Sequence, residues 1–173
     1  MNEYLTAVLF FLPAGLANTT PVFVNRTPVL RDWNTPLDFG KSWHGKRIFG
    51  DNKRLRGLIF GTLVGGLTAV VVSNLNADVY IDLQPFWAGS MLGFGALSGD
   101  AVESFFKRRR GIDAGKSWFP FDQLDYIIGG LLVVYPFVDL PERALLTIVV
   151  SYFGLHLLVA YSAYLLGLKD KPI

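Results

Sequence analysis

The stretch that decides the fold is GDAVESFFKRRRGIDAGKSWFPFDQLD, residues 99–125. It begins inside an apolar run, passes through four consecutive cations at 107–110 and enters a second apolar run. Asp100 and Glu103 lie within the first run, and each carboxylate in bilayer-length apolar sequence costs about 2.5 to 3.5 kcal/mol on insertion scales. Sequences that retain such groups commonly use them for ions, substrates or protons. We therefore expect a membrane protein with a functional site where these acids meet the cations.

The composition also indicates a membrane protein. Of the 173 residues 51% are hydrophobic, and the mean hydropathy is +0.38, which is too apolar for an ordinary soluble domain of this size. The chain has no cysteine, which excludes a disulfide framework and a thiolate metal site. The N-terminal sequence MNEYLTAVLFF lacks the basic region of a signal peptide, so we expect it to be retained as a spanning helix.

Five segments are long and apolar enough to cross a bilayer, which predicts an all-α integral membrane protein forming a single membrane domain over residues 1–173. The predicted spans are residues 4–24, 57–77, 86–106, 123–140 and 144–168. Glycine pairs within two of them, Gly65-Gly66 and Gly129-Gly130, indicate close packing between helices.

The lysines and arginines predict the orientation. The loop 25–56 carries eight of the sixteen and the loop 107–122 carries five, and such charges are retained on the cytoplasmic side. Five spans place both loops and the C-terminal tail on one side. The sequence therefore predicts a multi-pass protein of the cell membrane, with an external N-terminus and two functional cytoplasmic loops that hold the active site.

Helical spacing groups the acids of residues 99–125. One face of the third span holds Asp100, Glu103, Ser104 and Lys107, and one face at the start of the fourth holds Asp122 and Asp125. Oxygen atoms from two helices at one depth could coordinate Mg²⁺, which favours carboxylates together with substrate phosphate oxygens. The alternative is a structural ion pair between Asp100 or Glu103 and Lys107 or Arg108.

A second motif, PLDFGKSWHGKRIFGDNKRLRG at 36–57, alternates glycines with cations. Glycine lets backbone N–H groups approach phosphate oxygens, and the cations neutralise them. The pattern is not a Walker A loop and is weak by itself. In the first span, Asn18, Thr19 and Thr20 either bond neighbouring helices or line a polar cavity that binds a nucleobase or ribose.

The two motifs together resemble a known family. GDAVESFFKRRRG followed by DQLD resembles the integral-membrane CTP:phosphatidate cytidylyltransferases, which carry Gly-Asp, then Ser-x-x-Lys-Arg, then a loop that ends in Asp-Arg-x-Asp. The matching positions are Gly99-Asp100, Ser104, Lys107-Arg108, Asp122 and Asp125. The chain departs in having Gln123 in place of the arginine and in lacking the preceding His-Gly-Gly. Its length, PAGLAN at 13–18 and the glycines and cations of 38–57 are similar to a shorter archaeal branch, the CDP-archaeol synthases.

The resemblance implies a Mg²⁺-dependent transfer of CMP from CTP to the phosphate of an archaeal ether lipid, 2,3-bis-O-(geranylgeranyl)-sn-glycerol 1-phosphate, with no nucleic-acid partner. The implied metal ligands are Asp100, Ser104, Asp122 and Asp125. Lys107 and Arg108 would hold the lipid phosphate or the leaving pyrophosphate. The implied nucleotide-binding residues are Asn18, Asp38, Gly40, Lys46, Arg47, Gly50, Lys53, Arg56 and Gly57.

Three alternatives remain open from the residues alone. Physical reasoning does not choose between this ether lipid and an ester-linked phosphatidic acid, the acceptor of a CDP-diacylglycerol synthase. A small cation channel or transporter would use the intramembrane acids as an ion path, although they cluster at one face of the membrane. A scaffold that binds anionic lipid through its basic loops would leave the acids unexplained.

Overall fold

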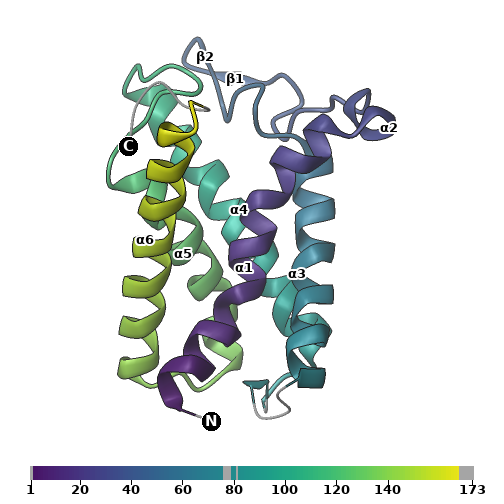
Figure 1. Ribbon diagram of the computed structural model, residues 1–173. Helices are drawn as coiled ribbons and strands as arrows, with labels where there is room; N and C mark the ends of the chain where they lie inside the picture. The colour runs from purple at the N-terminus through teal and green to yellow at the C-terminus, as the bar shows by residue number, and fades with distance from the viewer. Residues whose placement is uncertain (1, 76–78, 81, 168–173) are drawn as a thin grey trace.

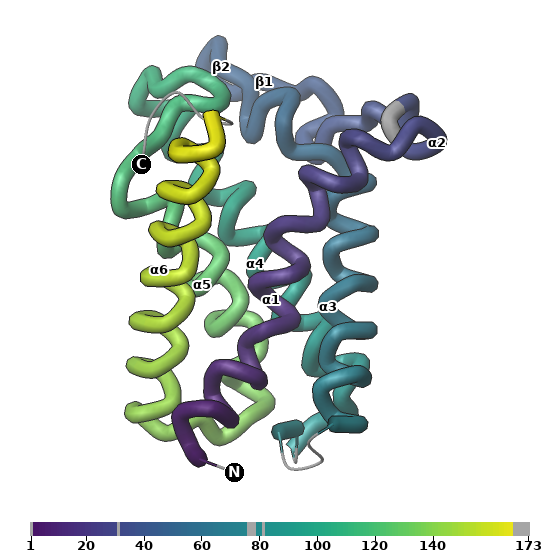
Figure 2. Tube along the Cα trace, viewed as in Figure 1, coloured from purple at the N-terminus to yellow at the C-terminus, as the bar shows by residue number. Residues whose placement is uncertain are grey.

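The computed structural model describes residues 2–75, 79–80 and 82–167. Within this part of the chain, the long helices are α1 (Glu3–Arg26), α3 (Leu55–Leu75), α4 (Pro85–Arg109), α5 (Phe121–Val134) and α6 (Glu142–Leu165). They form one antiparallel bundle, with the start of α1 at one end and the α4–α5 connection at the other (Figures 1 and 2). The predicted helical fold class is confirmed.

The connection between α1 and α3 is folded and lies over one end of the bundle (Figure 1). It contains a short helix, α2 (Pro28–Arg31), and a hairpin of β1 (Ser42–Trp43) and β2 (Lys46–Arg47) that the sequence did not predict. His44 and Gly45 form the hairpin turn with φ of 51° and 74°, the left-handed conformation that such two-residue turns require.

Two helix ends differ from the predicted spans. α4 continues through Arg109, so most of the basic run lies on its last turn instead of in a loop. Arg110 caps the helix and Gly111 follows with a φ of 74°, while the Ile112 N–H donates to the Lys107 carbonyl as in a Schellman motif. α5 ends at Val134 and passes into a 3₁₀ turn, η2 (Tyr135–Phe137), because Pro136 cannot continue the helix. Residues 76–77 and 168 of the predicted spans, and the tail lysines, lie outside the described residues.

Glycines hold α4 close to both of its main neighbours. A Cβ atom on Gly65 of α3 would lie 2.5 Å from the Gly89 carbonyl oxygen of α4. Between α4 and α5, a Cβ atom on Gly129 would lie 2.3 Å from the Gly95 carbonyl oxygen. Side chains at these positions would push the helices apart, which confirms that the glycines serve helix packing.

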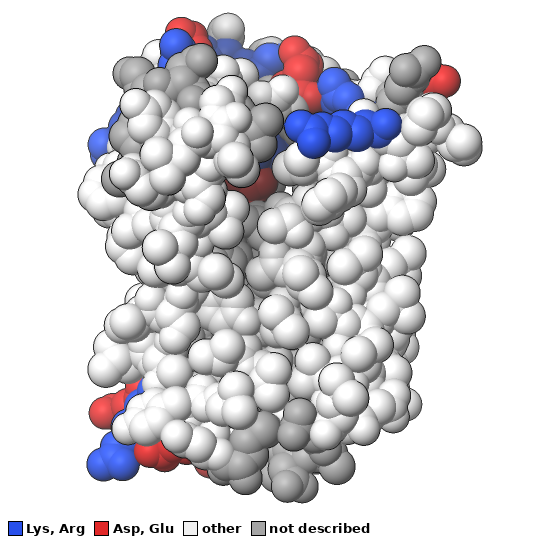
Figure 3. Space-filling view, in the orientation of Figure 1, with Lys and Arg blue, Asp and Glu red and all other residues white. Residues whose placement is uncertain are grey.

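On the face of the bundle that Figure 3 shows, the middle is apolar and the charges gather at the two ends. Large hydrophobic side chains are exposed along the helices, among them Leu67, Leu132 and Leu158, each 59% to 69% exposed. In the part of the chain that the structure describes, α1, α3 and α6 are long and apolar enough to cross a membrane. Such a surface is expected where lipid replaces water as the solvent.

Candidate active site

A cavity of about 390 Å³ opens at the end of the bundle that carries the hairpin. Its walls come from α1, the segment before α3, α4, the α4–α5 loop, the start of α5 and His156 of α6. Figure 3 looks into a hollow on this face, with acidic atoms at its back and cationic atoms above it. The predicted site residues that line the cavity are Asn18, Gly50, Lys53, Gly57, Asp100, Ser104, Lys107, Arg108, Asp122 and Asp125.

Three carboxylates meet in this cavity. One oxygen atom from each of Asp100, Glu103 and Asp125 lies within 4.8 Å of the others, in a geometry that could hold a metal ion. Asp100 and Glu103 come from α4 and Asp125 from α5. Gly99 permits this meeting, because a Cβ atom there would lie 2.2 Å from the Asp125 carbonyl oxygen.

Two lysines neutralise part of this acidic charge. The Lys53 ammonium donates to both carboxylate oxygens of Asp100 at 2.6 Å. Lys107 bridges two helices by contacting Glu103 at 3.2 Å and forming an ion pair with Asp122. The alternative of an ion pair between Glu103 and Lys107 is therefore present in the structure, beside the carboxylate cluster.

Asp122 lies at the start of α5 and has a different environment from Asp125. Its Oδ2 atom accepts a hydrogen bond from the Trp118 N–H at 2.8 Å, and its Oδ1 atom accepts one from the Lys107 ammonium. Among the described residues, the grouping of close carboxylates includes Glu103, whose role the sequence left open, and does not include Asp122.

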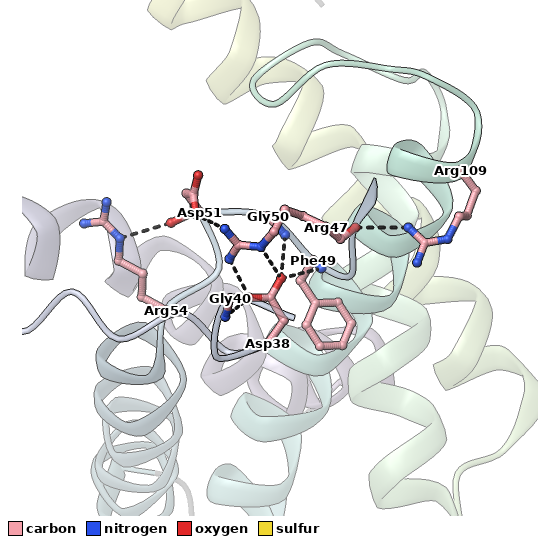
Figure 4. Close-up of polar contacts among 8 residues, drawn as sticks. All are labelled: Asp38, Gly40, Arg47, Phe49, Gly50, Asp51, Arg54 and Arg109. Carbon is pink, nitrogen blue, oxygen red and sulfur yellow. Dashed lines mark hydrogen bonds and ion pairs between the residues drawn. The ribbon is translucent and has the colours of Figure 1, made fainter. Parts of the chain in front are cut away.

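A second carboxylate, Asp38, organises the hairpin segment (Figure 4). Its buried oxygens accept from the Arg47 guanidinium at 2.5 and 3.3 Å and from the backbone N–H groups of Gly40, Phe49 and Gly50 at 3.0 to 3.1 Å. Burial by itself would raise the pKa of Asp38, but the bond from Arg47 and the three backbone bonds outweigh it and hold the pKa at about 2. Asp38 therefore stays ionised and fixes the loop.

Arg109 ties this loop to the end of α4 (Figure 4). Its guanidinium donates to the Arg47 carbonyl at 3.0 Å and lies 4.2 Å from the centre of the Phe105 ring. In return, the Lys46 ammonium donates to the Arg109 carbonyl at 3.4 Å. The segment that covers the cavity is thus anchored to the helix that carries Asp100 and Glu103.

Several predicted nucleotide-binding residues do not line the cavity: Asp38, Gly40, Lys46, Arg47 and Arg56. Arg56 is only 1% exposed, and its guanidinium bonds the Asn25 side chain at 2.7 Å and the Leu30 carbonyl at 2.7 Å. The nucleotide contacts of these five residues stay predictions, because the bonds observed for them are within the protein.

The cavity also holds residues that the sequence did not select: Asn52, Arg54, Glu103, Lys116, Gln123 and His156. Helical spacing had grouped Glu103 with Asp100 without giving it a role. Lys116 has no periodic signal because it lies in the α4–α5 loop. His156 belongs to no motif in the sequence, and the tertiary fold brings it to the cavity.

Comparison with known proteins identifies the family. The family model for the CarS-like CDP-archaeol synthases matches residues 1–173. The chain belongs to the CDP-archaeol synthase family. The match covers all of the sequence, including both motifs that carried the resemblance, and it confirms that resemblance.

Curated relatives and a solved structure agree with this family. The CDP-archaeol synthase of Thermococcus kodakarensis is 35% identical, covering 99% of this chain and 98% of the relative. That of Methanospirillum hungatei is 37% identical over 86% of this chain and 95% of the relative. A structure described as an intramembrane enzyme for archaeal membrane lipids biosynthesis matches with a TM-score of 0.76 and 30% identity, covering 88% of this chain and 91% of that one. The predicted reaction class, a CTP-using cytidylyltransferase of membrane lipid biosynthesis, is confirmed by family membership.

Proposed function

We propose that this member of the CDP-archaeol synthase family transfers CMP from CTP to 2,3-bis-O-(geranylgeranyl)-sn-glycerol 1-phosphate in a Mg²⁺-dependent reaction within the described cavity. The observation that carries this proposal is the meeting of three carboxylates and two lysines in a cavity beside an apolar, lipid-facing bundle. Acidic and cationic groups together suit a metal-bound polyphosphate. A cavity of about 390 Å³ also lies in the usual range for small-molecule sites.

We propose that all five long helices cross the membrane, with the N-terminus outside. α4 carries charges and α5 is short, but both pack against α1 and α3 or α6 in the same bundle. The hairpin and the α4–α5 loop then share the cytoplasmic side, as the distribution of lysine and arginine predicts. CTP would reach the cavity from the cytoplasm.

The residues present fit a magnesium ion. Asp100, Glu103 and Asp125 would supply hard oxygen ligands, and Ser104 on the same wall would supply a further oxygen. When bound, Mg²⁺ would neutralise charge on the phosphate oxygens. Asp122 is a ligand by resemblance, but its contacts with Lys107 and the Trp118 N–H favour a positioning role.

The cations that line the cavity would hold the phosphates: Lys53, Arg54, Lys107, Arg108 and Lys116. An oxygen of the lipid phosphate attacks the α-phosphorus of CTP. A new P–O–P linkage forms, the bond between the α-phosphorus and the β-bridging oxygen breaks, and pyrophosphate leaves. A phosphate monoester is already ionised near neutral pH, so the residues need only to align the reactants and neutralise charge.

The lipid acceptor would enter sideways from the bilayer. The glycines that join α3 to α4 and α4 to α5 are occupied in helix contacts, and the entry we propose is the side of the cavity between α1 and α6. Pro21 and Val22 of α1 and His156 of α6 line the cavity at this side, and Val22 is 52% exposed. The phosphate could then reach the carboxylate cluster while the tails stay in lipid.

Radiolabelled CTP tests the proposal directly. The purified protein is incubated with labelled CTP and Mg²⁺ or EDTA, and with the ether lipid phosphate or phosphatidic acid. We expect a labelled CDP-lipid with the ether acceptor and Mg²⁺, and none with EDTA. A channel or scaffold would give no labelled lipid, and equal turnover of phosphatidic acid would contradict the proposed acceptor.

A further inference from the structure

The carboxylate cluster already contains a cation that belongs to the protein. Lys53 donates to both oxygens of Asp100 at 2.6 Å, so the ammonium covers the carboxylate face that a metal ligand must present. The two side chains are 21% and 25% exposed, so water screens this pair only in part. A divalent ion that binds Asp100 must therefore share or displace the ammonium.

Hydrogen bonds fix the backbone of Lys53, whereas its side chain is a flexible four-carbon stem. The Lys53 N–H donates to the Gly50 carbonyl at 3.4 Å, and the Lys53 carbonyl accepts from the Leu37 N–H at 2.8 Å. Gly50 is held in turn by Asp38. A flexible four-carbon stem on this fixed point lets the ammonium reach other parts of the cavity that Lys53 lines.

We propose that Lys53 is an exchangeable counter-ion: it neutralises Asp100 in the empty enzyme and transfers to the nucleotide phosphates when CTP and metal enter together. The inference rests on the proposed function of the cavity. Metal alone must compete with Lys53, whereas CTP offers the ammonium another anion. Metal and nucleotide therefore bind with positive coupling, and Lys53 carries a large part of it.

The geometry predicts that a substitution of Lys53 strengthens metal binding instead of weakening it. Lys53→Met removes the competing cation and keeps most of the apolar stem, so the metal alone should bind more tightly than in the wild type. Coupling free energies between sites commonly correspond to about 5- to 150-fold, so we expect a gain of at least about fivefold in Mn²⁺ affinity. The increase in Mn²⁺ affinity caused by CTP should shrink by a similar factor.

Electron paramagnetic resonance of free Mn²⁺ measures this without turnover, in detergent and without lipid acceptor, with and without CTP. Lys116→Met is the matched control, because Lys116 lines the same cavity but, among the described residues, makes no ion pair with the three carboxylates. Without CTP it should change Mn²⁺ affinity less than about twofold, since an exposed lysine without a direct contact is largely screened. Unchanged or weaker Mn²⁺ binding by Lys53→Met, or an equal gain in Lys116→Met, would overturn the exchange.

Asp100→Asn separates this inference from the proposed function. If Asp100→Asn loses Mn²⁺ binding while Lys53→Met behaves as the wild type, the metal site stands and the counter-ion role fails. If Asp100→Asn binds Mn²⁺ as the wild type does, the proposed metal site itself is wrong, and the exchange at Asp100 fails with it.

Discussion

The two acidic sites at the loop end of the bundle, Asp38 and the carboxylates of the cavity, differ in how their charge is balanced. Asp38 receives five hydrogen bonds, two of them from Arg47, and no oxygen of its carboxylate is left without a donor. In the cavity, by contrast, Asp100, Glu103 and Asp122 pair with Lys53 or Lys107, and among the described residues Asp125 makes no ion pair with either lysine. A carboxylate saturated with donors fixes a loop, whereas carboxylates that lie close to one another and share two lysines can take up a further cation.

The largest expected effect is the loss of turnover when one carboxylate of the close group in the cavity is neutralised. Asp100→Asn should lower CDP-lipid formation at least about a hundredfold, the scale typical of groups that stabilise transferring charge. Asp38→Asn should lower kcat far less, because Asp38 does not line the cavity. The rate of labelled product formation at saturating CTP measures the effect of each variant. Similar losses in the two variants would contradict the contrast between Asp38 and the carboxylates of the cavity.

Substitutions of Glu103 and Asp122 should separate a metal-binding role from a positioning role within the cavity. Glu103→Gln should raise the Mg²⁺ concentration needed for half-maximal activity at least about tenfold, since its oxygen belongs to the close group and loss of even an outer-shell partner costs about that much metal affinity. Asp122→Asn should act mainly on the apparent KM of lipid phosphate or CTP, because Asp122 positions Lys107. Initial rates over a Mg²⁺ titration distinguish the two effects. A raised Mg²⁺ requirement in Asp122→Asn but not in Glu103→Gln would show that Asp122 is the metal ligand.

Gly99→Ala tests whether helix contact builds the carboxylate cluster. The new methyl group would meet the Asp125 carbonyl oxygen, so α4 and α5 must separate. We expect a loss of about 1 to 3 kcal/mol of stability, together with weaker metal binding. Gly154→Ala is the control, because a Cβ atom there meets nothing within 4 Å.

Thermal unfolding in detergent and Mn²⁺ affinity are measured for both glycine variants. Wild-type values in Gly99→Ala would show that the cluster does not depend on this contact. A loss of equal size in Gly154→Ala would show that the effect is not specific to it.

The smallest effect is the pH dependence of the Asp38 loop. Its pKa of about 2 lies below the ordinary value of 3.8, so the ionised form is favoured by folding. The stabilisation, about 2 kcal/mol at about 1.36 kcal/mol per pKa unit, is fully present above pH 3.8 and is lost as pH falls toward 2. Proteolysis of the loop by pepsin between pH 4.5 and 2 should increase in the wild type and be insensitive to pH in Asp38→Asn, after correction for pepsin activity. A flat wild-type profile would contradict the ionised role of Asp38.

The sequence predicted the helices well because their apolar runs and flanking charges are local signals. The grouping of Asp100, Glu103, Ser104 and Lys107 on one face also follows from helical spacing, and all four line the cavity. The Lys53 contact with Asp100 joins residues 47 positions apart, so no local pattern reveals it.

The hairpin segment was harder to predict for the same reason. Its cations were expected to contact phosphates, but Arg47 and Lys46 bond Asp38 and the Arg109 carbonyl. Composition showed the charges of this loop without showing which of them neutralise one another. Arg109, read from sequence as a topology signal, also anchors the loop through the Arg47 carbonyl.

The central claim is that the Asp100–Glu103–Asp125 cluster is the magnesium site of cytidylyl transfer. Its most direct test is the Mg²⁺ dependence of CDP-archaeol formation by the wild type and Asp125→Asn, each confirmed as folded by thermal unfolding. We predict that the wild type requires Mg²⁺ and that Asp125→Asn is inactive or needs at least about tenfold more Mg²⁺. An Asp125→Asn protein with wild-type activity and an unchanged Mg²⁺ requirement would contradict the account.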